Sequence, residues 1–112
     1  MHRVQERRRH TRSALVCPAA IRDKSGNLLL RGRACDVAPC GIRVLGQGGA
    51  GLREGHDIWI ELTAPNPRRS GPPTRIVKLR GQVRRISDMG EWKNVVVVIF
   101  ETNFSKRFME VV

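Results

Sequence analysis

The sequence predicts an all-β fold, namely a six-stranded antiparallel (split) β-barrel with a short C-terminal α-helix. Three observations support this prediction. Short apolar segments are separated by clusters of turn-forming residues, several segments alternate apolar and polar residues, and residues 95–100 form an unbroken apolar run. A length of 112 residues suits one compact domain with a single core.

Turn-forming residues divide the chain into its expected elements. Residues 23–27 (DKSGN) and 36–41 each predict a turn, and the glycine-rich residues 46–51 predict a loop. Residues 64–74 contain four prolines and predict an exposed hairpin insertion, while residues 88–90 predict the last turn. The expected strands are residues 14–22, 28–35, 42–45, 58–62, 76–86 and 95–100.

Periodicity indicates which side chains face the core and where the chain becomes helical. In the fourth and fifth expected strands, apolar residues alternate with polar or basic ones. The tail, residues 102–112, places Phe104, Phe108 and Val111 at helical spacing, which predicts an amphipathic helix that closes one end of the barrel. The expected core positions of the two strands are Ile58, Ile60, Leu62, Val77, Leu79, Gly81 and Val83.

The charge indicates an anionic partner. The formal net charge is +11, the isoelectric point is about 11.4, and 17 of the 21 basic residues are arginines. Arginine binds phosphate in a bidentate manner and stacks on purines, so nucleotides and nucleic acids are both candidate ligands. The few aromatic residues do not interleave with the arginines as a single-strand platform requires, which disfavours nucleic acid. Residues 1–12 predict a flexible basic arm and residues 13–112 the barrel domain.

Several other classes of protein are not supported by the sequence. The longest apolar run has six residues, too few to span a membrane, and no secretory h-region follows the basic start, so we expect a cytoplasmic location. Three cysteines without a CxxC pair indicate free thiols rather than a metal site. No GxSxG, HExxH or paired carboxylates predict catalysis, and we expect no enzyme, metal or cofactor.

Two short motifs occur at defined places relative to the expected strands. Arg8 and Arg12 form RxxxR before the first expected strand, and Asp36 and Gly41 bracket the turn between the second and third strands. On this strand pattern the motifs resemble RxxxR and D/NxSxxG of the PilZ family, bacterial receptors for the second messenger cyclic di-GMP. The resemblance covers about residues 6–101, with Ala38 where the family has serine.

The resemblance implies that Arg8 and Arg12 bind cyclic di-GMP, a dianion with two guanines. Arginines bind phosphates and the O6/N7 edge of guanine, and an arm that becomes ordered around a ligand can relay its binding. Arg7 and Arg9 are auxiliary candidates for stacking on guanine or binding phosphate. The alternative for all four is a solvated basic arm without a ligand.

The second motif implies three further ligand-site positions. Asp36 can accept hydrogen bonds from guanine N1–H and its amino group, or it can cap the local turn. Gly41 permits a positive φ or a close backbone approach. Ala38 lacks the hydroxyl of the family's serine, and losing a hydrogen bond to a charged group weakens binding about ten- to a hundredfold.

These observations predict a cyclic di-GMP receptor that signals to a protein partner controlling motility, exopolysaccharide production or virulence. One alternative is an adaptor that has lost nucleotide binding and acts through protein contacts, which Ala38 favours. Another is a barrel that binds nucleic acid, with a steep dependence on salt. The identity of the protein partner, the ligand stoichiometry and the formation of a homodimer stay open at this stage.

Overall fold

The computed structural model describes residues 17–38, 41–66 and 70–100, with only the backbone at residue 38. These residues form six strands and no helix, which confirms the all-β prediction. The predicted arm (1–12) and the predicted helix (102–112) lie outside the described residues. The strands are β1 (Cys17–Arg22), β2 (Leu28–Ala38), β3 (Gly41–Gly48), β4 (Asp57–Pro65), β5 (Thr74–Met89) and β6 (Trp92–Ile99).

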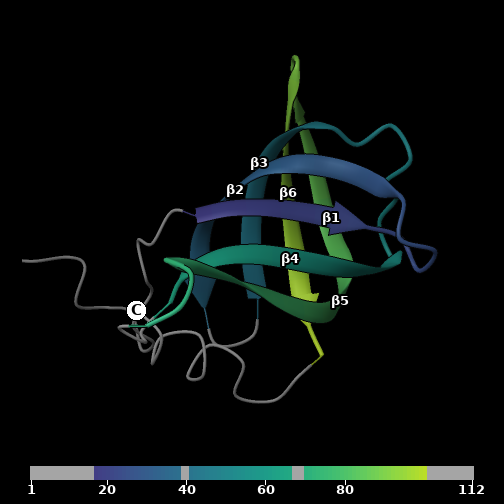
Figure 1. Ribbon diagram of the computed structural model, residues 1–112. Helices are drawn as coiled ribbons and strands as arrows, with labels where there is room; N and C mark the ends of the chain where they lie inside the picture. Colours follow the sequence, from purple (N-terminus) through teal and green to yellow (C-terminus); the bar gives the residue numbers. More distant parts are fainter. Residues whose placement is uncertain (1–16, 39–40, 67–69, 101–112) are drawn as a thin grey trace, which may run out of the picture.

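The six strands form a closed barrel in the order β1-β2-β3-β6-β5-β4, with every pair antiparallel (Figure 1). Pairing of β1 with β4, for example Ala19 with Leu62, closes the sheet. The split in our prediction is therefore wrong for these strands, because each has a neighbour on both sides. Closure satisfies the backbone groups that an open edge would leave unpaired.

The core lies inside the barrel and consists of alternate residues from all six strands. The predicted inward positions of β4 and β5 are confirmed, with only Val77 half-buried. Burying one such aliphatic side chain contributes about 1.5–3 kcal/mol, so the core stabilises the barrel without any buried charge among the described residues. Its largest fully buried side chains include Ile21, Leu30, Ile42, Ile60, Leu62 and Leu79.

Several strands extend beyond their predicted ends because cross-strand pairing continues past the local turn signals. The β2 strand continues through Asp36 to Ala38, so the predicted turn over 36–41 is wrong and only residues 39 and 40 separate β2 from β3. The β3 strand continues to Gly48, since its Gly46 pairs with Gly32 of β2. Part of the predicted loop over 46–51 is therefore strand.

Two connections shape the ends of the barrel. Asp23 accepts hydrogen bonds through Oδ1 from the backbone N–H groups of Ser25 and Asn27, at 2.9 Å each, which confirms the predicted turn. The β5–β6 hairpin extends beyond the rest of the barrel, at the top of Figure 1. Its strands pair as far as Met89 and Trp92, so the chain turns at residues 90–91 rather than at 88–90.

Candidate functional site

The motif residues that the structure describes lie where β2 ends and β3 begins. Asp36 and Ala38 lie among the last three residues of β2, and Gly41 is the first residue of β3. The backbones of Ala38 and Gly41 pair directly, which brings the two halves of the second motif together. The predicted arginines lie outside the described residues, and their role stays a prediction: Arg7, Arg8, Arg9 and Arg12.

A β-bulge directs Asp36 to the outside of the barrel. Ala34 follows the regular register with β3, whereas Asp36 pairs with Arg43, so Cys35 is an extra residue in β2. Ala34 and Val37 are both buried, while only about a fifth of the Asp36 side chain (20%) remains exposed. Without the bulge, strict alternation from Ala34 would point Asp36 into the apolar core.

Asp36 forms an ion pair with Arg43 on the neighbouring strand. Arg43 Nη2 donates to Asp36 Oδ2 at 3.1 Å, and the Arg43 side chain is 44% exposed. A pair this accessible to water contributes only about 0.2–1 kcal/mol to stability. A ligand that offers an anion to Arg43 and N–H donors to Asp36 can therefore replace the pair at little cost.

Gly41 is required by a close backbone approach and not by a positive φ. A Cβ atom at this position would lie 2.9 Å from the carbonyl oxygen of Val97 on β6, closer than side-chain atoms normally come. Its φ is not among the positive values found at other glycines. Of the two explanations that the sequence left open, the structure supports the close approach.

A second bulge, in β5, aligns Arg85 with the Asp36–Arg43 pair. Val83 of β5 pairs with Val97, but Arg85 pairs with Val96, so Arg84 is an extra residue. Since Val96 also pairs with Arg43, the strand register gives one row across four strands, which we call the motif row: Asp36, Arg43, Val96 and Arg85. The bulge sends the exposed Arg85 outward between the partly buried Ile86 and the core residue Val83.

Arg85 is not among the site residues that the sequence predicts. The signal was present, because apolar residues at positions 83 and 86 are three apart and break the two-residue period of a strand. The same interruption occurs between positions 34 and 37, around Asp36. In both cases the pattern indicates a bulge that turns a charged side chain outward.

The motif row has the chemistry of a nucleotide site. Its four residues span three strand spacings, about 14 Å. The guanidinium groups of Arg43 and Arg85 can bind phosphate oxygens, and the Asp36 carboxylate at the β2 end of the row can accept the paired N–H donors of a guanine edge. The half-buried Val96 supplies an apolar surface between the charges.

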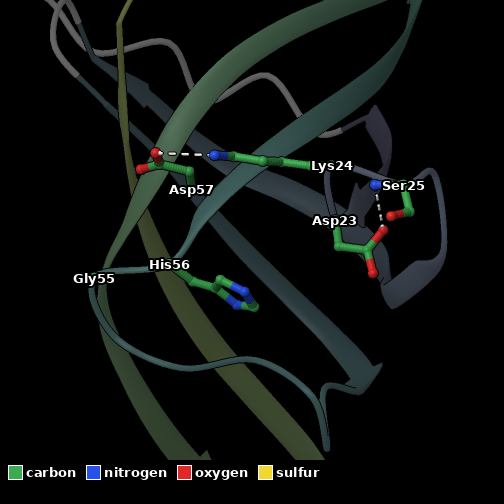
Figure 2. A pocket seen from close by; sticks show the side chains of 6 residues that line it. All are labelled: Asp23, Lys24, Ser25, Gly55, His56 and Asp57. Atoms are coloured by element: carbon green, nitrogen blue, oxygen red, sulfur yellow. Dashed lines mark hydrogen bonds and ion pairs between the residues drawn. The ribbon is translucent and has the colours of Figure 1, made fainter.

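A pocket at another place on the barrel contains none of the predicted site residues. It has a volume of about 340 Å³ and lies between the β1–β2 turn and the connection that enters β4 (Figure 2). Lys24 Nζ lies 3.8 Å from Asp57 Oδ2 across it. Hydrogen bonds, chiefly from the backbone N–H of Asn27, lower the pKa of Asp23. Asp23 thus holds its own turn, and we assign this pocket no ligand.

Two features that would indicate other functions are absent from the described residues. In the ranges 17–38, 41–66 and 70–100, no group of three or more His, Cys, Asp or Glu side chains could hold a metal ion. The same part of the chain has no helix that is long and apolar enough to cross a membrane.

Comparison with known proteins identifies the family. The model of the PilZ domain matches residues 6–110, so the chain belongs to the PilZ domain family. Members of this family are receptor or adaptor domains rather than enzymes, and their ligand is cyclic di-GMP. The resemblance predicted from the two motifs is confirmed. No curated protein matches the chain.

A solved structure shares the fold. The Bacillus subtilis inhibitor of motility (MotI/DgrA) aligns with a TM-score of 0.66 and 18% sequence identity. The alignment covers 93% of this chain and 47% of that one, so this chain spans about half the length of MotI/DgrA. At this level of identity the likeness establishes the barrel fold alone.

Proposed function

We propose that this protein is a cyclic di-GMP receptor that relays the level of the second messenger to a protein partner in the bacterial cytoplasm. Membership of the PilZ family supports the choice of ligand. The observation that carries the proposal is the motif row, where a bulge turns Asp36 outward beside Arg43. Motility, exopolysaccharide production and virulence are the candidate processes, and MotI/DgrA is itself an inhibitor of motility.

The proposed mechanism uses the two motifs together. Arg8 and Arg12 bind the phosphates or guanine edges from one side, and Asp36 accepts the guanine N1–H and amino hydrogens. Arg43, and across β6 Arg85, add positive charge on the barrel surface. Ligand binding then fixes the arm that precedes the barrel, and this changes the surface that a partner meets.

Ala38 sets the expected strength of binding. Alanine cannot donate or accept the hydrogen bond that the family's serine offers, and such a bond to a charged group is worth about 1.5–3 kcal/mol. We therefore expect an affinity about ten- to a hundredfold weaker than that of the Ala38→Ser variant.

Calorimetric titration tests this function. Wild type should release or absorb saturable heat with cyclic di-GMP but not with GTP or a short RNA. Arg12→Ala and Asp36→Ala should each lower the affinity at least about tenfold, because each removes a charged ligand contact. Arg53→Ala is the matched control, since Arg53 is exposed on a loop outside the motif row. If Arg53→Ala and Arg12→Ala lowered the affinity equally, the loss would reflect the general positive charge and not a specific contact.

The second candidate function is an adaptor that no longer binds the nucleotide. The specific observation in its favour is Ala38 in the position of the motif serine. It predicts no heat with wild type at high ligand concentration. Restored binding in Ala38→Ser would then identify the missing hydroxyl as the cause, and continued absence of heat would show that the site is lost more widely.

A further inference from the structure

A groove of about 410 Å³ crosses the outer face of the barrel beside Trp92, at the opposite end of β3 from Gly41. Arg31 and Arg33 of β2 line one side of it, Leu45 and Gln47 of β3 form its middle, and Trp92 of β6 lines the other side. We call these residues the Trp92 groove. None of them belongs to either PilZ motif.

The strand register explains why these residues meet. Arg31 pairs with Gln47, and Gln47 pairs in turn with Trp92, so the three form one row across β2, β3 and β6. Met89 of β5 is opposite Trp92 and continues the row onto the projecting hairpin seen in Figure 1. A row that ends on a projecting hairpin is accessible to another molecule.

The apolar part of this surface is exposed to solvent. Trp92 is 43% exposed and Met89 57%, and the two are cross-strand partners near the hairpin tip. Tryptophan and arginine are the residues that most often dominate the energetics of protein interfaces, and methionine adapts its shape to different partners. The composition of the row therefore fits a protein interface.

The other tryptophan lies in a different environment. Trp59 on β4 is half-buried and has Lys78 Nζ and Arg80 Cζ each 5.9 Å from its ring centroid. In contrast, within the described part of the chain, the side chains of Arg31 and Arg33 make no hydrogen bond or ion pair. The cations of the Trp92 groove are thus available to an external anion.

We propose that the Trp92 groove binds an extended acidic segment of a partner protein, with an apolar side chain of that segment against Trp92 and Met89. Arg31 and Arg33 lie two residues apart on one strand face, about 6.6–7 Å along the strand. Carboxylates at alternate positions of an extended segment have the same spacing. The two arginines and two such carboxylates therefore match in both charge and distance.

The surface favours this occupant over two others. Nucleic acid binding would need several stacking surfaces, whereas the groove offers one tryptophan beside Leu45 and Gln47. A twofold dimer through the same face would pack together two copies of a surface that is lined by two arginines and no carboxylate, which like charges oppose. The proposal rests on the adaptor part of the proposed function, but it does not require cyclic di-GMP to bind.

Fluorescence titration of the full chain tests the proposal. In a Trp59→Phe background, Trp92 is the only tryptophan and reports directly on the groove. The probe is a pool of capped peptides with glutamate at two alternate positions and leucine, methionine or phenylalanine at the next alternate position, so that all three side chains lie on one face, at about 150 mM salt to screen distant charges. We expect saturable binding to this pool and at least tenfold weaker binding to a pool with glutamine in place of glutamate.

Matched charge reversals separate the groove from the general positive charge. Arg31→Glu with Arg33→Glu should weaken binding at least tenfold, while Arg53→Glu with Arg75→Glu, the same charge change elsewhere, should stay within twofold. Met89→Ser should also weaken binding and keeps the tryptophan as reporter. No binding by wild type, or equal weakening by both double variants, would overturn the proposal.

Two further experiments test whether a nucleic acid or a second copy of the chain occupies the groove instead. A short single-stranded oligonucleotide that competes with the peptides through Arg31 and Arg33, and binds more tightly than they do, would overturn the proposal in favour of nucleic acid. Concentration-dependent self-association lost in Trp92→Ala would do so in favour of a second copy. Calorimetry with cyclic di-GMP separates a failure of the proposed function from a failure of this proposal. Asp36→Ala should weaken binding of cyclic di-GMP but leave peptide binding intact.

Discussion

The motif row and the Trp92 groove occupy the same outer face of the barrel but differ in how their charges are arranged. In the motif row, Asp36 and Arg43 already form an ion pair across two strands. In the Trp92 groove, Arg31 and Arg33 face the solvent beside an exposed Trp92. The first surface suits a ligand that exchanges partners with an existing pair, and the second suits a partner that supplies the missing charge.

The backbone differs between the two surfaces as well. Extra residues in β2 and β5 border the motif row and set the direction of its side chains. Between Arg31 and Arg33, beside the groove, the register with β3 is regular and the strands approach closely at Gly32 and Gly46. The bulge residue Cys35 also lines the groove, on the side toward the motif row. Irregular backbone thus directs single side chains at one surface, whereas close, regular strands keep side chains in rows at the other.

The largest effect on the free energy of unfolding is expected at Gly32, where β2 and β3 approach closely beside the groove. A Cβ on Gly32 would lie 2.0 Å from the carbonyl oxygen of Leu45 and 2.4 Å from the Cα of Gly46, so Gly32→Ala must push β2 and β3 apart. We expect a loss of at least about 3 kcal/mol in the free energy of unfolding, at the upper end for overpacking. Urea denaturation followed by circular dichroism measures it. A loss below 1 kcal/mol would show that the strands separate easily here.

The fold was largely predictable from the sequence because strands leave local signals. Alternation in β4 and β5 identified the core positions, and the DKSGN cluster identified the first turn. Strand ends were less predictable, since pairing partners decide them. The β2 strand continues through Asp36 because β3 is opposite, and no local signal shows a partner strand.

The two surfaces were predictable to different degrees for a similar reason. Asp36 and Gly41 lie on one hairpin, so they form a short motif that the sequence displays. The Trp92 groove joins Arg31 to Trp92, which are distant along the chain and adjacent only through β3. A surface assembled across strands leaves no motif, and only the register reveals it.

A moderate effect is expected at the glycine of the motif. Gly41→Ala places a Cβ 2.9 Å from the Val97 carbonyl oxygen, a milder conflict than at Gly32. We expect a loss of about 1 kcal/mol, because the clash is partly offset by the lower entropy of the unfolded alanine chain. Urea denaturation should place this variant between wild type and Gly32→Ala. If Gly41→Ala were less stable than Gly32→Ala, the closer approach of the strands would not lie beside the Trp92 groove.

The smallest effect is expected from the ion pair of the motif row. In a double-mutant cycle with Asp36→Ala and Arg43→Ala, the coupling energy in the free energy of unfolding should be about 0.2–1 kcal/mol, because the Arg43 guanidinium is exposed to water. The coupling should fall as salt rises toward about 1 M, where charges are screened beyond a few ångströms. A coupling well above 1 kcal/mol would mean that the pair is a structural element of the barrel. Asp36 would then be costly for a ligand to recruit, and the exchange on which the proposed binding mode depends would lose its physical basis.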